Sequence, residues 1–125
     1  MAGTALFVYG TLMDERLLAT LTGRRFARRP ARLEGFARLV PPGGYAYVVP
    51  QPGAHVEGIL LEDVDPLSLR RLDAYEELGR LYARRPAEVI VEGARRRCQV
   101  YVGLPAVTRP RAPAPGGTRG PASGG

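Results

Sequence analysis

The sequence predicts an α+β fold: a small, mixed, mostly antiparallel β-barrel with about two helices. The chain has 125 residues, which is enough for one domain with a single hydrophobic core. About six short segments have the composition of β-strands, whereas only two have helical periodicity. Two helices are too few for the crossovers that a parallel sheet requires, so short antiparallel connections are expected.

The first elements are indicated by an apolar run and by helix caps. Residues 5–9 (ALFVY) are apolar and predict a buried strand, which ends at Gly10. Asp14 is placed to cap a short helix over residues 15–21, whose leucines share one face, and Gly23 is placed to end it.

The middle of the chain predicts strands separated by turns. Residues 25–40 alternate loosely between apolar and polar, which predicts one or two strands interrupted near residues 34–35. Residues 45–49 and 55–61 predict two more, and Gly58 in the second indicates a bulge or a close backbone approach. The Pro- and Gly-rich turns between them are expected at 41–44 and 50–53.

The second helix has the strongest start signal in the chain. Asp65 is a typical N-cap and Pro66 a typical first helical residue. We expect the helix to reach Glu76 or Glu77, with Gly79 as its stop. The remaining strands are expected at 82–92 and 96–102, joined by a turn at Gly93-Ala94.

The composition divides the chain into a domain over residues 1–104 and a tail over residues 105–125. The tail has five Pro, five Gly and one branched aliphatic residue, so we expect it to be disordered. It also holds three Arg and no acid. The domain therefore has 15 Arg against 12 acids, a net +3 of the total +6.

Six arginines that follow the first predicted helix could bind nucleic acid or form a solvated surface. No aromatic RNA-binding pattern, helix-turn-helix spacing or zinc finger accompanies them, so we favour the solvated surface and expect no nucleic-acid partner. The arginines of this group are Arg24, Arg25, Arg28, Arg29, Arg32 and Arg38.

No secretory signal or apolar run of about 20 residues is present, which predicts a cytoplasmic protein without a membrane span.

The composition also excludes several kinds of site. The chain has no Lys, which excludes a Walker-type phosphate loop and Schiff-base chemistry. One His and one Cys cannot form a zinc site of Cys and His ligands. The two serines stand at a helix start and in the tail, which argues against a Ser–His–Asp site. We expect no metal, and any chemistry depends on carboxylates, Tyr, Arg, Thr or the backbone.

Glu76 is the candidate general acid/base. On a helical wheel it projects between Leu69 and Leu72, on the core side, whereas Asp73 projects toward the other side. Burial disfavours an ionised carboxylate and raises its pKa, and a raised pKa suits a general base near neutral pH. From this geometry alone, a carboxylate neutralised by Arg80, Arg84 or Arg85 is equally compatible.

The turn after the first strand is the second candidate feature. Gly10 allows a tight turn that exposes main-chain N–H groups, which can bind a carboxylate or an oxyanion. Tyr9 and Thr11 add hydroxyl groups beside them. Most turns of this kind are only structural, so the turn alone does not establish a site.

Together these residues resemble the γ-glutamylcyclotransferase-like superfamily, in particular its AIG2-like and γ-glutamylamine cyclotransferase branch. The resemblance spans residues 5–102 and depends on the order of short motifs. Many members have Gly directly after the catalytic Glu, where this chain has Glu77. The matching residues are Tyr9-Gly10-Thr11-Leu12, Val56-Glu57-Gly58, Leu72-Asp73-Ala74-Tyr75-Glu76, Tyr82 and Arg84.

The resemblance implies a small barrel that needs no cofactor and acts on a small γ-glutamyl-type substrate. It assigns catalysis to Glu76 and substrate binding to Tyr9, Gly10, Thr11, Leu12 and Tyr82. In the implied reaction, the α-amine attacks its own side-chain amide and releases 5-oxoproline and an amine or amino acid. The alternative hypothesis is a binding module that holds a small anion or metabolite in the same pocket without turnover. The sequence predicts neither the leaving amine nor the oligomeric state.

Overall fold

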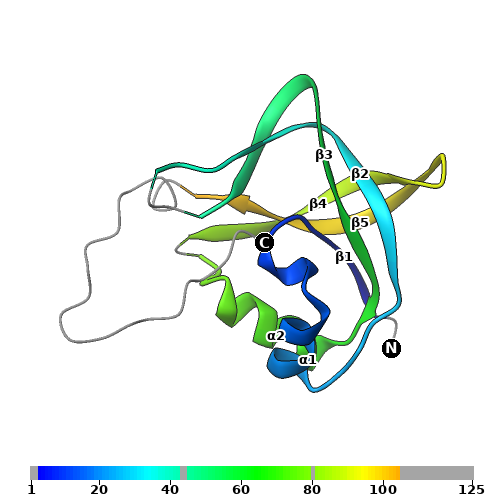
Figure 1. The fold of residues 1–125 in the computed structure, drawn as a ribbon, viewed down its shortest axis with the longest axis vertical. Coiled ribbons are helices and arrows are strands. Elements are labelled where there is room, and N and C mark those ends of the chain that lie inside the picture. Colours follow the sequence, from blue (N-terminus) through cyan, green and yellow to red (C-terminus); the bar gives the residue numbers. More distant parts are fainter. Residues whose placement is uncertain (1–2, 43–44, 80, 105–125) are drawn as a thin grey trace.

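The computed structural model describes residues 3–42, 45–79 and 81–104. In these residues five strands form a closed barrel, in the order β1-β3-β2-β4-β5, and two α-helices pack together beside it (Figure 1). The predicted α+β barrel is confirmed. The elements are β1 (Thr4–Val8), the 3₁₀ helix η1 (Thr11–Met13), α1 (Glu15–Thr22), β2 (Arg28–Leu39), β3 (Tyr47–Val64), α2 (Pro66–Tyr75), β4 (Tyr82–Val91) and β5 (Ala94–Gly103).

β1 joins the two ends of the sheet. Its residue Phe7 lies opposite Leu60 in the antiparallel pairing with β3, and opposite Val100 in the parallel pairing with β5. The other strand pairings are antiparallel. The apolar run at the N-terminus is therefore buried on both faces, as its composition predicts.

Alternating residues of the strands contribute to two hydrophobic cores. One core fills the barrel, and the other lies between the barrel wall and the helices. The barrel core includes Phe7, Leu33, Val56, Leu60 and Val100. The helix-side core includes Leu6, Val8, Leu61, Leu72, Tyr82 and Tyr101. The candidate acid follows α2, which contributes Leu69 and Leu72 to the helix-side core.

The structure has one strand where the sequence predicts two. The segments expected as strands at 45–49 and 55–61 both belong to β3, so the barrel has five strands and not about six. The prediction of a turn at 50–53 that separates two strands is therefore wrong. Of the turn expected at 41–44, residues 43–44 lie outside the described residues.

A bulge within β3 replaces the expected turn. Along the pairing with β2, Phe36 lies opposite Pro50, whereas Glu34 lies opposite His55. Four residues of β3 therefore stand opposite Gly35 alone, which adopts a φ of 82°. Pro and Gly redirect the strand locally without ending its pairing.

The C-terminal hairpin agrees closely with the sequence. β4 and β5 pair along their whole length, from Tyr82 opposite Gly103 to Val91 opposite Ala94. Glu92 and Gly93 both have positive φ, 51° and 79°, which is the type of turn that fits a two-residue hairpin loop. The turn is thus one residue earlier than predicted, and the predicted tail at 105–125 lies outside the described residues.

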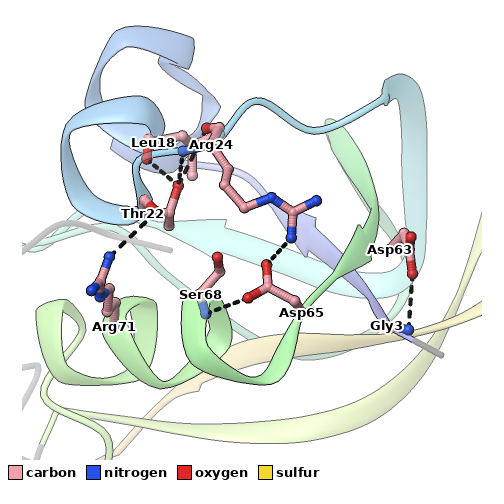
Figure 2. A network of polar contacts seen from close by, with 8 residues as sticks. All are labelled: Gly3, Leu18, Thr22, Arg24, Asp63, Asp65, Ser68 and Arg71. Atoms are coloured by element: carbon pink, nitrogen blue, oxygen red, sulfur yellow. Dashed lines mark hydrogen bonds and ion pairs between the residues drawn. The ribbon is translucent and has the colours of Figure 1, made fainter. Parts of the chain in front are cut away.

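Polar contacts fix α1 against the start of α2 (Figure 2). Asp65 caps α2 by accepting a hydrogen bond from the Ser68 N–H at 3.1 Å, and it forms an ion pair with Arg24. Hydrogen bonding to Ser68 above all, together with the Arg24 charge, lowers the pKa of Asp65 to about 2. Arg71 on α2 donates to the Thr22 carbonyl at the end of α1, at 3.3 Å. These contacts fix the first two turns of α2 against the end of α1 and the segment that follows it.

α2 ends in a Schellman motif. The Leu78 N–H donates to the Asp73 carbonyl at 3.0 Å, and the Glu77 N–H donates to the Ala74 carbonyl at 3.1 Å. This motif places the second residue after the helix in the left-handed region, a position usually occupied by Gly. Here the residue is Glu77, with φ 54°. The helix ends at Tyr75, slightly earlier than predicted.

Gly58 of β3 lies in close contact with β1. A Cβ atom at this position would lie 2.4 Å from the Val8 carbonyl oxygen and 2.6 Å from the Phe7 ring. Both distances are far inside van der Waals contact. The close backbone approach predicted for this glycine is confirmed.

We expect Gly58→Ala to destabilise the domain by about 1–3 kcal/mol, because the new methyl group forces β1 and β3 apart. Gly53→Ala is the matched control: it has a φ of 84°, but no atom lies within 4 Å of an added Cβ. Its cost is conformational, about 1 kcal/mol. Urea denaturation measures both, and a smaller loss for Gly58→Ala than for Gly53→Ala would contradict the packing argument.

We expect Glu77→Gly to raise the free energy of unfolding by about 0.5–1 kcal/mol, because Gly relieves the left-handed strain and only part of the gain is lost to unfolded-state entropy. Glu77→Ala removes the same side chain but keeps a Cβ atom. The Gly variant should therefore be more stable than the Ala variant by about 1 kcal/mol. Equal stability of the two variants in denaturant titrations would show that the backbone at this position is not strained.

Candidate active site

Glu76 directly follows α2, and its side chain is fully buried. Its relative exposure is 0%, although Tyr75 and Glu77 on either side are partly exposed. The Glu76 N–H donates to the Leu72 carbonyl at 2.9 Å, so its backbone still follows the helix. The predicted orientation, on the same side as Leu69 and Leu72, is confirmed.

Three buried tyrosines lie around the Glu76 carboxylate. They are Tyr9 after β1, Tyr82 at the start of β4 and Tyr101 in β5. Burial is the main cause that raises the pKa of each phenol far above its usual value, and the negative charge of Glu76 raises each pKa further. The charge of one carboxylate acts on all three phenols, so Glu76 lies near each of them. The phenols therefore stay protonated at any physiological pH.

Hydrogen bonds hold these tyrosines in place. Tyr9 Oη donates to the Tyr101 carbonyl at 2.6 Å, and Tyr82 Oη donates to the Ala46 carbonyl at 2.7 Å. The rings of Tyr82 and Tyr101 meet edge to face, with centroids 6.4 Å apart. The phenols thus connect β1, β3, β4 and β5 into a rigid wall beside Glu76.

The loop after β1 reaches the end of α2. Gly10 precedes the 3₁₀ helix η1, whose first internal hydrogen bond joins the Met13 N–H to the Gly10 carbonyl at 3.0 Å. The N–H groups of residues 10–12 precede this bond, so the helix itself does not use them. Thr11 is exposed, and its Oγ1 lies 3.5 Å from the Tyr75 hydroxyl. The loop and the residue before Glu76 are therefore neighbours.

The predicted site residues have different environments in this neighbourhood. Thr11 and Gly10 have surface that a ligand can contact, whereas the Leu12 side chain is fully buried in the helix-side core. Leu12 can therefore contribute only its backbone. Tyr9 and Tyr82 are 1% and 0% exposed and use their hydroxyls within the protein.

Asp73 differs from the orientation predicted by the helical wheel. Its side chain is only 14% exposed and does not point to open solvent. Asp73 Oδ1 accepts hydrogen bonds from Arg84 Nε at 3.0 Å and from Tyr101 Oη at 2.6 Å. Asp73 Oδ2 accepts from Arg84 Nη2 at 3.0 Å. Arg84, one candidate partner for Glu76, is thus engaged with Asp73, while Arg80 lies outside the described residues.

The sequence analysis missed two tyrosines of this site. Tyr101 donates a hydrogen bond to Asp73, and the charge of Glu76 also acts on its phenol. Tyr45, just before β3, lies close enough to Tyr82 to raise its pKa. Both come from parts of the chain remote from α2, and only the pairing of the strands brings them there. The apolar alternation of β5 was the one available signal for Tyr101, and it does not identify the facing element.

The other candidate groups lie elsewhere. Burial raises the pKa of the Cys98 thiol to about 12, so it is not a nucleophile at neutral pH. Among the described residues, no group of His, Cys, Asp and Glu side chains is arranged to hold a metal ion. Neither α-helix in the described ranges is long and apolar enough to cross a membrane.

Most of the arginine cluster is engaged with acids or with the backbone. Such pairing fits the solvated surface expected from the sequence, because it neutralises much of the positive charge. The ion pairs are Arg24–Asp65, Arg25–Glu15, Arg29–Glu62, Arg29–Glu92 and Arg32–Glu34, and Arg28 donates to the Met13 carbonyl.

Two surface grooves lie away from Glu76. A groove of about 490 Å³ runs over β4 and β5 beside the start of β1, with Ala5, Ala87 and Cys98 in its lining. A second groove, of about 260 Å³, lies between β2 and β4. Neither is lined by Glu76 or by the loop after β1.

Comparison with known proteins gives a consistent family. The model of the family described as gamma-glutamyl cyclotransferase, AIG2-like, matches residues 6–118. A protein from Arabidopsis thaliana has 26% identity and a TM-score of 0.73, with 82% of this chain and 70% of that chain covered. This chain spans only 63% of the length of a second Arabidopsis protein of the same fold.

Two further structures extend the similarity to animals and fungi. An AIG2-like protein from Mus musculus has 25% identity and a TM-score of 0.71, with 85% of this chain and 80% of that chain covered. A yeast gamma-glutamyl cyclotransferase specific to glutathione shares the fold, at 16% identity and a TM-score of 0.66, with 90% and 75% covered. Comparison with curated protein sequences gives no significant match. The chain belongs to the gamma-glutamyl cyclotransferase, AIG2-like family.

Proposed function

We propose that this protein is a cofactor-free γ-glutamyl cyclotransferase with Glu76 as its general acid/base. The observation that carries the proposal is the position of Glu76: a fully buried carboxylate beside the loop after β1, in a chain of this family. Its substrate is a small γ-glutamyl amide, and we expect the cytoplasm as its compartment.

The reaction needs one group that accepts a proton and then returns it. The α-ammonium of the substrate loses a proton to the Glu76 carboxylate, and the free amine attacks the γ-carbonyl carbon to form the new C–N bond of a five-membered ring. The tetrahedral intermediate then expels the original amide nitrogen, which takes the proton from Glu76 and leaves as an amine. The ring nitrogen gives its second proton to the regenerated Glu76 carboxylate, which passes it to the released amine or to water. 5-Oxoproline remains, and neither oxidant nor reductant is consumed.

The loop after β1 supplies donors for the negative charges of the substrate. The N–H groups of residues 10–12 can bind either the α-carboxylate or the oxyanion that develops on the carbonyl. Ring closure joins two groups of the same molecule, so holding the amine against the carbonyl lowers the barrier substantially. Tyr82, whose hydroxyl is fixed to Ala46, would line the pocket on the opposite side.

Substrate must displace side chains to reach Glu76, because its carboxylate has no exposed surface. The contact between Thr11 Oγ1 and Tyr75 Oη is long, at 3.5 Å. Thr11 is exposed and Tyr75 is partly exposed. We propose entry at this point, which leads directly to the amides of the loop.

We expect Glu76→Gln to lower 5-oxoproline release from γ-L-glutamyl amides by about 10²–10⁴-fold, since the amide cannot exchange the proton. Glu77→Gln is the matched control: the same change one residue along the chain should leave activity of the same order. Chromatographic measurement of 5-oxoproline from γ-L-glutamyl methylamide and γ-L-glutamyl-L-alanine tests this. Circular dichroism should show the same fold for all three proteins.

Two results would contradict the proposal. Full activity of Glu76→Gln on a substrate that the wild type turns over would exclude Glu76 as the acid/base. Thermal stabilisation of the wild type by γ-glutamyl compounds, without any product, would instead support the binding module.

A further inference from the structure

The end of α2 holds two carboxylates at positions three residues apart. Residues i and i+3 of a helix have Cβ atoms about 5–6 Å apart, so Asp73 and Glu76 are neighbours on the helix surface. The phenol of Tyr101 is influenced by the charges of both, so both carboxylates lie near it. The negative charge of Asp73 therefore opposes the ionisation of Glu76.

The position at the helix end makes this opposition stronger. The C-terminus of a helix carries a partial negative charge, which disfavours an ionised carboxylate there. The last turn of α2 contains no basic residue. A positive charge has to come from another element, and it comes from Arg84 on β4.

Arg84 binds Asp73 in a two-bond arrangement. Its Nε and Nη2 atoms donate to the two carboxylate oxygens at 3.0 Å each, and Tyr101 Oη adds a third hydrogen bond at 2.6 Å. The side chains of Asp73 and Arg84 are 14% and 25% exposed, so solvent screens the pair only partly. Hydrogen bonding to Asp73 raises the pKa of Arg84, which keeps the guanidinium charged.

We propose that Arg84 and Asp73 are positioning residues for Glu76: Arg84 cancels the Asp73 charge, and the pair holds the Tyr101 phenol between Asp73 and Glu76. This proposal rests on the proposed function, in which Glu76 must change its protonation twice. The pair sets the pH at which the Glu76 carboxylate becomes available as a base. The phenols on which the Glu76 charge acts, Tyr9, Tyr82 and Tyr101, are unchanged in the test below. Tyr45 and Tyr75, which act on Tyr82, and Arg38 of β2, which acts on Tyr9, are unchanged as well.

The chain contains a matched ion pair at the opposite end of α2. Arg96 donates to both oxygens of Glu62 at 2.9 and 2.5 Å, and Glu62 is 21% exposed. Glu62 lies shortly before α2, which is about 15 Å long. Loss of this pair removes a comparable two-bond contact without changing the charge near Glu76.

The test removes the charge of Arg84 or the charge of Asp73, and the two variants should shift the pH profile in opposite directions. In Arg84→Gln, the uncompensated Asp73 charge should shift the acid limb of the kcat/KM profile upward by about half to one pH unit. In Asp73→Asn, the uncompensated Arg84 charge should shift it downward by a similar amount. The double variant should return toward the wild-type profile, and Arg84→Lys, which keeps the charge, should stay near it.

Glu62→Gln is the control and should lower stability while leaving the acid limb in place. The substrate probe is γ-L-glutamyl methylamide for every variant, so the titration of the substrate is common to all of them. Carboxyl ¹³C NMR titration, with the Glu76 signal assigned by its loss in Glu76→Gln, measures the same midpoint without turnover. A melting curve for each variant shows which remain folded.

The outcomes separate this inference from the proposed function. Shifts of opposite sign in the two single variants support the inference, whereas shifts in the same direction, no shift, or an equal shift in Glu62→Gln overturn it. Absence of 5-oxoproline from the wild type would refute the proposed function, and the NMR midpoints would then decide the electrostatic role alone. If Arg84→Gln does not fold, the shift of the acid limb in Asp73→Asn is compared with that in Arg84→Lys. A downward shift in Asp73→Asn alone supports the inference, and any other result overturns it.

Discussion

The rest of the structure depends on one costly placement, a carboxylate held out of water at the end of a helix. Removal of a charged group from water costs several kcal/mol unless the protein supplies compensating interactions. Glu76 lies near three buried phenols, Tyr9, Tyr82 and Tyr101, whose hydroxyls donate to other acceptors of the protein. Closure of the barrel brings β1, β4 and β5 together, so the barrel is a requirement for the site as well as a scaffold.

Much of the fold follows from signals that are local in the sequence. Asp14 and Asp65 cap their helices as expected, and the β4–β5 hairpin follows from two β-favouring runs around a glycine turn. The inward orientation of Glu76 was also predictable, since helical periodicity relates it to Leu72 over four residues. β3 was not predictable, because its bulge contains the same Pro and Gly residues that end strands elsewhere.

Recognition of the remaining site residues required information on tertiary contacts. A helical wheel predicts the direction of a side chain around the helix axis, but it does not predict which neighbouring elements the helix contacts. α2 meets the barrel wall through more than one face, so Asp73 lies against Arg84 and Tyr101 although it projects away from Leu69. Tyr101 is 28 residues from Asp73 in the chain, and strand pairing alone determines that they meet.

The two helices of this chain differ in how they end, and the difference is informative. α1 ends at Gly23, which adopts the left-handed conformation at no steric cost. α2 ends with a buried acid, then Glu77 in the same conformation, and without a basic residue in its last turn. Each of these features lowers stability, and a sequence selected for stability alone would contain none of them. The burial of an acid at Glu76, beside the loop after β1, is expected where function, and not folding, determines the residue.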